Sequence, residues 1–307
     1  MDMESKKEAR RGIFIYLAVT FVLTYGVEIF LVMPLAGSTD IRLAYMAQML
    51  IAGVMFIPAA GALVTRLITK EKLTKENMMV SLNLRGNLKY YGIAWFGVAF
   101  MIIFGAVLYF LIFPKHFDGN MGYIKAVLEA NGQGKTDSSQ VMQFMYIQMA
   151  VGILLAPFLN FINCFGEEWG WRGYLLPKLR KCFTVVPAVL VNGVIWGIWH
   201  APLIAVGHNY GTGYRGYPMT GILAMCLFCV VMGIIFSYIT IKTGSCIPAV
   251  LAHGMLNGFA AAGISFTSLE NPYNVFLGPA PTGLIGGAGF IAVAGVFLFR
   301  LYKEEKS

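Results

Sequence analysis

The sequence contains few charged residues. Asp, Glu, Lys and Arg make up only 12% of its 307 residues, whereas 58% are hydrophobic. Soluble globular domains usually carry about 25% charged residues, so this composition excludes an ordinary soluble protein. We find no internal repeat, low-complexity segment or soluble domain. The sequence therefore predicts a protein surrounded by the lipid bilayer, and we expect no nucleic-acid partner.

The sequence also has few cysteines and lacks a signal-peptide cleavage site. The five cysteines include Cys226 and Cys229, which have redox or zinc spacing. No second pair accompanies them, so we interpret them as small packing residues. No small-residue cleavage site follows the first apolar run, which is too long for a signal peptide. We therefore expect this run to be retained as a membrane span.

Long apolar runs are abundant, and each approaches the about 20 residues that a membrane-spanning helix needs. They fall at residues 13–35, 43–67, 89–113, 143–166, 185–206, 220–241, 246–265 and 281–301. The sequence thus predicts an all-α polytopic membrane protein with about eight transmembrane helices and an intramembrane active site.

The basic residues predict the orientation of these spans. With the N-terminus inside, 18 of the 23 lysines and arginines lie at cytoplasmic positions. The five outside are Arg42, Lys115, Lys125, Lys135 and Arg215. This asymmetry predicts cytoplasmic termini and an outer loop over 114–142, because cytoplasmic loops are enriched in basic residues. In a prokaryote, the protein would be integral to the plasma membrane.

Two adjacent carboxylates and an arginine stand out within the apolar sequence. Glu168 and Arg172 are four residues apart, so on a helix they share a face and can form an ion pair. Glu167 points about 100° away from Glu168 and is available for another role. These residues need an explanation because a buried charge is costly unless it is paired or functional. The alternative explanation is a charged turn where a span meets water.

Two histidines also fall within spans. These are His200 and His253, and His253 shares a helical face with Asn257, four residues later. The alternative for each histidine is that it is a buried packing residue with a hydrogen bond. A turn near residue 183 places Glu167 and His200 at a similar depth, about 25 Å along two helical arms. A straight helix over 143–180 would be about 57 Å long, so we expect a break near Pro157.

The polar residues predict hydrolytic chemistry. A carboxylate beside a histidine can activate water, and a second histidine with an amide can stabilise an oxyanion. Glutamate and histidine are also zinc ligands, which leaves a metal site open. Glu28 is a lone carboxylate in the first span. A hydrogen bond within the bundle is the simpler explanation for it.

Three motifs resemble those of the CPBP family of CAAX proteases and bacteriocin-processing (Abi) proteins, which includes the type II CAAX prenyl endopeptidase. They are Glu167-Glu168-x-x-x-Arg172, Trp196-x-x-x-His200 and His253-x-x-x-Asn257. The family usually has Phe where Trp196 stands, and an aromatic replacement should preserve packing. The motifs divide the chain into N-terminal spans and outer loop (1–142), a catalytic core (143–265), and a last span and tail (266–307).

The resemblance implies a role for each motif residue. Glu167 and His200 would activate water, and His253 and Asn257 would stabilise the oxyanion. Glu168 and Arg172 would orient the site or hold substrate, and Trp196 would have a structural or substrate-binding role. The resemblance favours a glutamate-type peptidase with no required cofactor. The metalloprotease alternative would hold zinc with Glu167, His200 and His253.

Signatures of other intramembrane proteases are missing. The sequence has no His-Glu-x-x-His zinc motif and no Gly-x-Ser-Gly, and its aspartates lie outside the predicted spans: Asp2, Asp40, Asp118 and Asp137. We expect a membrane-associated peptide or protein substrate. The alternatives are a transporter or channel with a polar relay and a non-catalytic immunity or scaffold member of the family. The sequence fixes neither the substrate nor the oligomeric state.

Overall fold

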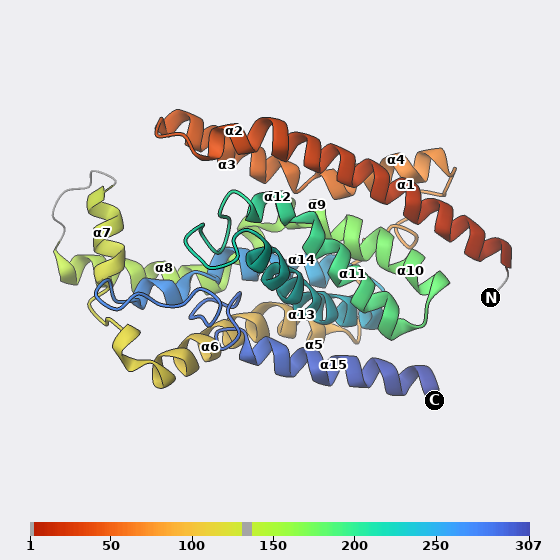
Figure 1. Ribbon diagram of the computed structural model, residues 1–307. Helices are drawn as coiled ribbons and strands as arrows, with labels where there is room; N and C mark the ends of the chain where they lie inside the picture. The colour runs from red at the N-terminus through yellow and green to blue at the C-terminus, as the bar shows by residue number, and fades with distance from the viewer. Residues whose placement is uncertain (1–2, 131–136) are drawn as a thin grey trace. The chain divides into compact units, whose positions relative to one another are not determined.

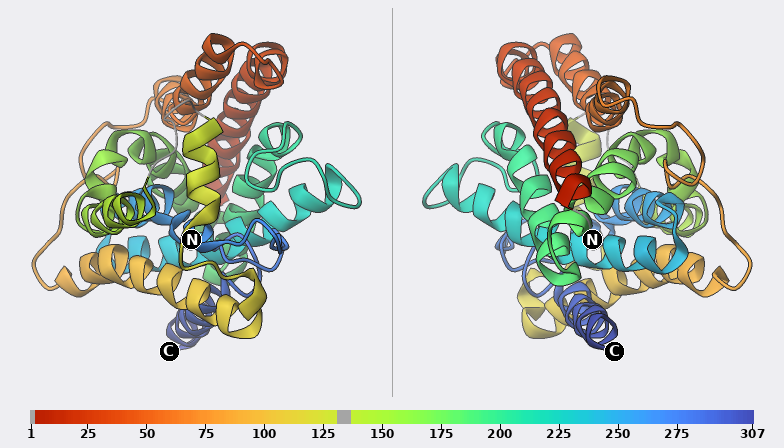
Figure 2. Two further views of the ribbon diagram at one scale, coloured as in Figure 1. Left: turned by 90° about the vertical axis from the view of Figure 1, so that its left-hand side faces the viewer. Right: turned by 90° about the vertical axis from the view of Figure 1, so that its right-hand side faces the viewer.

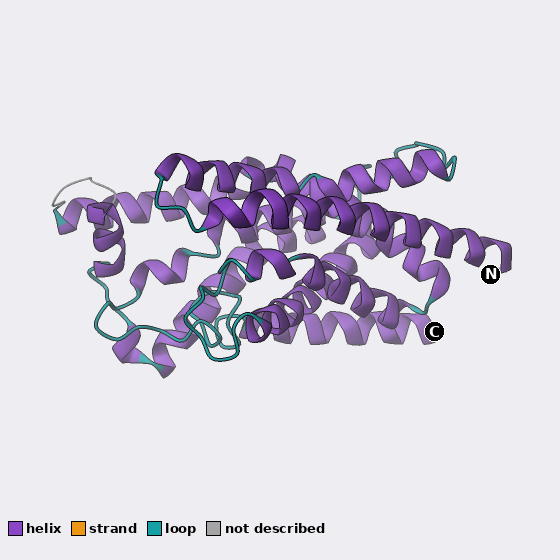
Figure 3. Ribbon diagram, turned by 45° about the horizontal axis from the view of Figure 1, so that its top comes forward, coloured by secondary structure: helices purple, strands orange, loops and turns teal. Residues whose placement is uncertain are grey.

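The computed structural model describes residues 3–130 and 137–307, which form helices and loops without a strand (Figures 1 and 3). The α-helices are α1 Met3–Val27, α2 Met33–Ala36, α3 Ile41–Val54, α4 Ile57–Ile68, α5 Leu88–Gly92, α6 Val98–Ile112, α7 Gly122–Ala130, α8 Ser138–Leu159, α9 Phe161–Gly170, α10 Leu176–Cys182, α11 Val185–Trp199, α12 Ala201–Ile204, α13 Met219–Thr243, α14 Ile247–Phe259 and α15 Ala288–Lys306. Short π-helical turns cover Glu28–Val32, Ile93–Gly97 and Trp171–Leu175, and 3-10 turns cover Pro114–His116 and Ala262–Phe266.

Six helical segments among the described residues are long and apolar enough to cross a membrane. They cover Ser5–Ala36, Ile41–Ile68, Leu88–Ile112, Ser139–Leu159, Met219–Thr243 and Ile247–Phe266. The predicted all-α polytopic fold is therefore confirmed.

Two of the eight predicted spans are not among these six segments. The helix expected over 185–206 ends at Trp199 and is a shorter apolar helix. The last helix begins at Ala288, and its final turns carry Arg300, Lys303 and Glu304. Length and charge therefore separate these two helices from the other six.

The predicted break near Pro157 is confirmed. Helix α8 contains Pro157 and ends at Leu159, and α9 begins at Phe161. A proline lacks the N–H that a helix interior needs, so the helix is weakened around it. The side chain of Asn160 donates to the carbonyl oxygen of Ala156 at 2.9 Å, and the backbone N–H of Asn160 donates to the same oxygen at 3.1 Å.

The described chain forms two compact units. The first contains residues 1–90, 161–250 and 293–307, and the second contains residues 91–160 and 251–292. Each unit is described by itself below. The segments 1–142, 143–265 and 266–307 were delimited by motifs and remain a prediction.

Close helix approaches organise the first unit. Helix α1 lies beside α3 and α4 in Figure 1 and in both views of Figure 2. Helix α11 packs against α13, where a Cβ added to Gly193 would lie 2.7 Å from the Cα of Val230, and one added to Gly197 would lie 2.5 Å from the Cα of Cys226. These two glycines form a Gly-x-x-x-Gly pattern, which lets spanning helices pack closely.

Hydrogen bonds hold the connection between α4 and α5 against other parts of the first unit. The indole of Trp169 donates to the carbonyl oxygen of Met78, and Asn83 donates to that of Thr243. Glu71 accepts from Lys178 at 2.7 Å and from Thr69 at 2.9 Å. Burial alone would raise the pKa of Glu71, but these hydrogen bonds and the nearby cations lower it below its ordinary value.

The second unit contains α6, α7 and α8 together with most of α14. The indole of Trp95 donates to the carbonyl oxygen of Ile153, and a Cβ on Gly254 would lie 2.8 Å from the carbonyl oxygen of Pro157. Helices α8 and α14 are therefore in close contact. The predicted loop 114–142 contains helix α7 and the first turn of α8; residues 131–136 lie outside the described residues.

Candidate active site

Glu167 lies in α9 and is only 3% exposed. Its Oε2 accepts a hydrogen bond of 2.8 Å from the indole Nε1 of Trp196 on α11. The two helical arms that the sequence predicts on either side of the turn near residue 183 therefore face each other at this depth. Trp196 lies one turn before His200, so the carboxylate of Glu167 is held beside the turn that carries the histidine.

His200 follows Trp199, the last residue of α11, as the C-cap of that helix, and it is buried. Its Nδ1 lies 2.9 Å from the carbonyl oxygen of Trp196 and 3.8 Å from the Sγ of Cys229. A carbonyl oxygen only accepts, so Nδ1 carries the hydrogen in this contact. In a neutral ring with this tautomer the lone pair is on Nε2, which can then accept a hydrogen bond from water.

The predicted ion pair of Glu168 and Arg172 is confirmed. Arg172 Nη1 donates to Glu168 Oε1 at 2.9 Å, and both side chains are 0% exposed. The Cζ of Arg172 also lies 4.3 Å from the ring centroid of Trp196 and 5.2 Å from that of Phe236. Cation–π contact with desolvated rings adds to the stability of the buried guanidinium.

These contacts form a continuous chain from Glu168 through Arg172 and Trp196 to Glu167. The arginine pairs with Glu168 and stacks on the indole, and the same indole donates to Glu167. The sequence predicted a structural or substrate-binding role for Trp196 but not its hydrogen bond to Glu167. An indole has one N–H donor and a phenylalanine has none, which is the one signal in the sequence for this added role.

His253 and Asn257 lie four residues apart on α14, within the second unit. His253 is buried at 4% exposure, whereas Asn257 is exposed. The structure thus groups Glu167, His200 and the residues around them in the first unit. It places the two predicted oxyanion donors together on one helix of the second.

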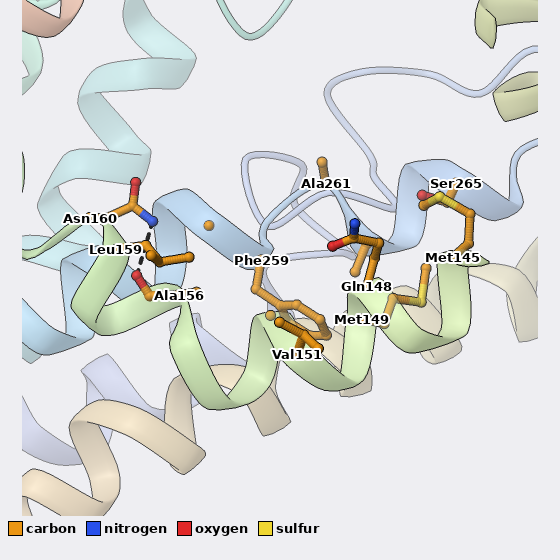
Figure 4. Close-up of a pocket in the computed structure, with 13 residues that line it drawn as sticks. Met145, Gln148, Met149, Val151, Ala156, Leu159, Asn160, Phe259, Ala261 and Ser265 are labelled. Atoms are coloured by element: carbon orange, nitrogen blue, oxygen red, sulfur yellow. Dashed lines mark hydrogen bonds between the residues drawn. The ribbon is translucent and has the colours of Figure 1, made fainter. Parts of the chain in front are cut away.

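An open pocket of about 390 Å³ lies next to this helix, within the second unit. Figure 4 shows Asn160 at one end, Met145 and Ser265 at the other, and Phe259 between them. Its lining is mostly apolar, and it includes Gly258, the residue after Asn257. Such a surface suits an apolar side chain or lipid chain, with a few polar groups that can fix its orientation.

Metal ligands are not clustered in the described part of the chain. Within residues 3–130 and 137–307, no three His, Cys, Asp or Glu side chains are grouped so that they could hold a metal ion. The zinc alternative would combine Glu167 and His200 with His253. Both this alternative and the expectation of a metal-independent site remain predictions.

Glu28 differs from its expected environment. It lies in the π-helical turn Glu28–Val32 and is 0% exposed. Neither of its carboxyl oxygens has a hydrogen-bond partner among the described residues. The prediction that Glu28 forms a hydrogen bond within the bundle is therefore wrong for the residues that the structure describes. The sequence could not show this, because it does not tell which residues pack around the Glu28 carboxyl group.

Comparison with known proteins gives two findings. Residues 149–259 match the family of Rce1-like type II CAAX prenyl endopeptidases. A protein of Methanococcus maripaludis described as CAAX prenyl protease 2 is 27% identical over 244 residues, which cover 79% of this chain and 82% of that protein. The matched segment contains all the residues of the three sequence motifs, from Glu167 to Asn257, and it excludes Glu28.

Proposed function

Because the chain belongs to the CAAX protease (CPBP) family, we propose that Glu167 and His200 activate the water with which it cleaves a peptide bond. The family match and the apolar helices support the broader statement that the chain is an intramembrane endopeptidase. The substrate we propose is a membrane-associated peptide or protein. We further propose that the protein is integral to the membrane with both termini in the cytoplasm.

The hydrogen bond between Trp196 and Glu167 carries this proposal. It holds a buried carboxylate at a fixed position beside the turn of His200. In the proposed reaction, Glu167 takes a proton from water while the water oxygen bonds to the peptide carbonyl carbon. The lone pair on His200 Nε2 orients the same water. A positioned base of this kind contributes about 10²- to 10⁴-fold to a rate.

We assign the remaining motif residues by their chemistry. His253 and Asn257 would donate hydrogen bonds to the oxyanion that develops on the substrate, because both carry N–H groups and share one face of α14. Glu168 and Arg172 would position the site, because their ion pair fixes the helical turn that follows Glu167. The pocket beside α14 would receive an apolar part of the substrate.

The test uses the full chain in lipid nanodiscs with a quenched fluorescent peptide. The name of the Methanococcus relative suggests a prenylated peptide with a CAAX ending as the first probe; the unprenylated peptide is its control. We expect Glu167→Gln to abolish cleavage, because the amide keeps the shape and cannot accept the proton. Asn257→Ala should lower kcat by about 100- to 1000-fold, the usual effect of removing one oxyanion donor.

The control variant is Glu270→Gln, which makes the same chemical change at an exposed glutamate in a loop. It should cleave as the wild type does. Full activity in Glu167→Gln would exclude Glu167 as the base. Zinc content and chelator sensitivity are measured on the same preparation. Activity that is lost to a chelator and restored by zinc would replace the glutamate mechanism with a metal-dependent one.

A further inference from the structure

Glu28 lies in a specific local environment within the first unit. The π-helical turn Glu28–Val32 interrupts the first span just before Pro34. A proline removes a helix hydrogen bond and crowds the preceding turn, which accounts for the interruption. π-helical turns are rare and are frequent at functional sites. This turn directs a carboxyl group into the interior of the protein rather than towards lipid.

Two hydrogen bonds fix Glu28 near the candidate active site. The indole of Trp199 donates to Thr24 Oγ1 at 2.8 Å, and the Tyr25 hydroxyl donates to the carbonyl oxygen of Ile198 at 2.7 Å. Thr24 and Tyr25, which lie just before Glu28, are therefore hydrogen-bonded to the two residues that immediately precede His200. The carboxyl groups of Glu28 and Glu167 are also close enough to interact electrostatically.

The environment of Glu28 lacks the partners that would stabilise a charge. Neither carboxyl oxygen accepts a hydrogen bond, and no cation pairs with it, among residues 3–130 and 137–307. An isolated buried carboxylate is very costly in an apolar interior. Two nearby carboxyl groups also resist being ionised together. The neutral acid, which is a proton donor, therefore suits the position of Glu28, while Glu167 has a donor to stabilise its charge.

We propose that Glu28 is a second carboxyl group of the hydrolytic site, which donates a proton to the amine that leaves. This inference rests on the proposed function. Glu167 takes one proton from water as the water oxygen bonds to the carbonyl carbon. When the C–N bond breaks, its electron pair stays on nitrogen, and that nitrogen takes the proton of Glu28. Glu167 then returns its proton to Glu28 through water, which restores both groups. Pairs of carboxyl groups that hold opposite protonation states divide acid and base roles in this way.

The test compares two probes that differ in their leaving group. One is the prenylated peptide of the previous assay, in which the leaving group is an amine that must be protonated. The other is the nitrophenyl ester of the same prenylated peptide, whose leaving phenolate needs no proton. The full chain and the variants Glu28→Gln and Glu28→Asp are assayed with both probes in nanodiscs.

We expect Glu28→Gln to lower kcat for the peptide by about 100-fold, within the usual range for a general acid, with little change in KM. The same variant should hydrolyse the ester almost as fast as the wild type. Glu28→Asp should recover part of the peptidase activity. Glu167→Gln should lose both activities, because both reactions need activated water.

The matched control is Tyr25→Phe, which removes the hydrogen bond to Ile198 and keeps the carboxyl group. A purely structural role for Glu28 predicts equal losses on both probes in Glu28→Gln, and that result would overturn the inference. Wild-type rates on both probes in Glu28→Gln would overturn it as well. A wild-type protein that cleaves neither probe contradicts the proposed function itself, and the inference fails with it. The ratio between the probes corrects for any loss of folded protein.

Discussion

At the scale of single residues, Trp196 links the buried ion pair to the proposed base. Its ring lies against the guanidinium of Arg172, and its N–H donates to Glu167. A hydrogen bond to a charged group contributes about 1.5–3 kcal/mol, more than one between neutral groups. The indole therefore stabilises the ionised form of Glu167 and fixes its direction. A phenylalanine at this position would fill much of the space without the donor.

This role predicts a specific effect of Trp196→Phe. The variant keeps an aromatic ring against Arg172 and removes the hydrogen bond to Glu167. We expect kcat for the peptide probe to fall by about 10- to 100-fold, which corresponds to the loss of one charge-assisted hydrogen bond. KM should change little, because Trp196 acts through Glu167 in this account. Steady-state kinetics in nanodiscs measures both constants.

The matched control is Trp95→Phe, which removes a partly buried indole donor in the second unit. Its partner is the carbonyl oxygen of Ile153 rather than a motif residue. It should therefore reduce thermal stability without a selective loss of kcat. If Trp196→Phe and Trp95→Phe lower kcat to the same degree, the hydrogen bond to Glu167 has no special role.

Residue spacing predicted part of this geometry. Helical periodicity placed Glu168 and Arg172 on one face and turned Glu167 away, and the observed ion pair agrees. The partner of Glu167 could not be predicted in this way. It depends on the depth and rotation of a second helix, which local spacing does not fix. The same limitation applies to Glu28, whose lack of partners is a property of the packed bundle.

At the scale of elements, helices are interrupted near several motif residues along the chain. Helix α8 ends at Leu159, a few residues before Glu167 in the sequence, the π-helical turn Trp171–Leu175 contains Arg172, and α11 ends directly before His200. Pro157 gave a sequence signal for the first interruption. The π-helical turn has no comparable signature, and an apolar run does not show where its helix ends. The span expected over 185–206 was too long for this reason.

The buried ion pair predicts unequal effects of two changes. In Arg172→Ala, Glu168 loses its cation in a site with no solvent exposure. Removing one partner of such a pair costs about 3–5 kcal/mol. The charge swap, Glu168→Arg with Arg172→Glu, retains an opposite pair four residues apart and should be less destabilising. Thermal unfolding in detergent and the yield of monodisperse protein measure the difference.

A second pair in the same unit provides the control for this comparison. Lys178 and Glu71 form an ion pair of 2.7 Å whose side chains are partly exposed. Lys178→Ala should therefore cost much less than Arg172→Ala, because solvent can stabilise the remaining carboxylate. Equal stability of the wild type, Arg172→Ala and the charge swap would mean that the pair of Glu168 and Arg172 contributes nothing.

At the scale of the whole molecule, composition predicted the class of protein but not the number of crossings. Six helical segments satisfy both length and apolarity, whereas α11 is short and α15 ends in charged turns. A short helix can lie within the bundle and be covered by its neighbours, so hydropathy alone does not decide its role. The orientation of the chain can nevertheless be tested at positions that do not depend on these two helices.

The basic residues predict that the connection 69–87 is cytoplasmic and that α7 is outside. The connection follows two long apolar segments and α7 follows three, and both precede α11. Their sidedness is therefore independent of whether α11 crosses the membrane. Single cysteines at exposed Glu76 and Glu129, in a chain whose native cysteines are replaced, report it. In intact cells, a membrane-impermeant maleimide should label Glu129→Cys and not Glu76→Cys.

A third cysteine, Ser307→Cys, tests the C-terminus. The C-terminus lies on the cytoplasmic side if α11 and α15 both cross the membrane or if neither does. We therefore expect Ser307→Cys to be protected from the maleimide in intact cells. Permeabilised cells are the control, and there all three variants should react. Labelling of Glu76→Cys from outside would reverse the predicted orientation. Labelling of Ser307→Cys together with Glu129→Cys, with Glu76→Cys still protected, would show instead that only one of α11 and α15 spans the membrane.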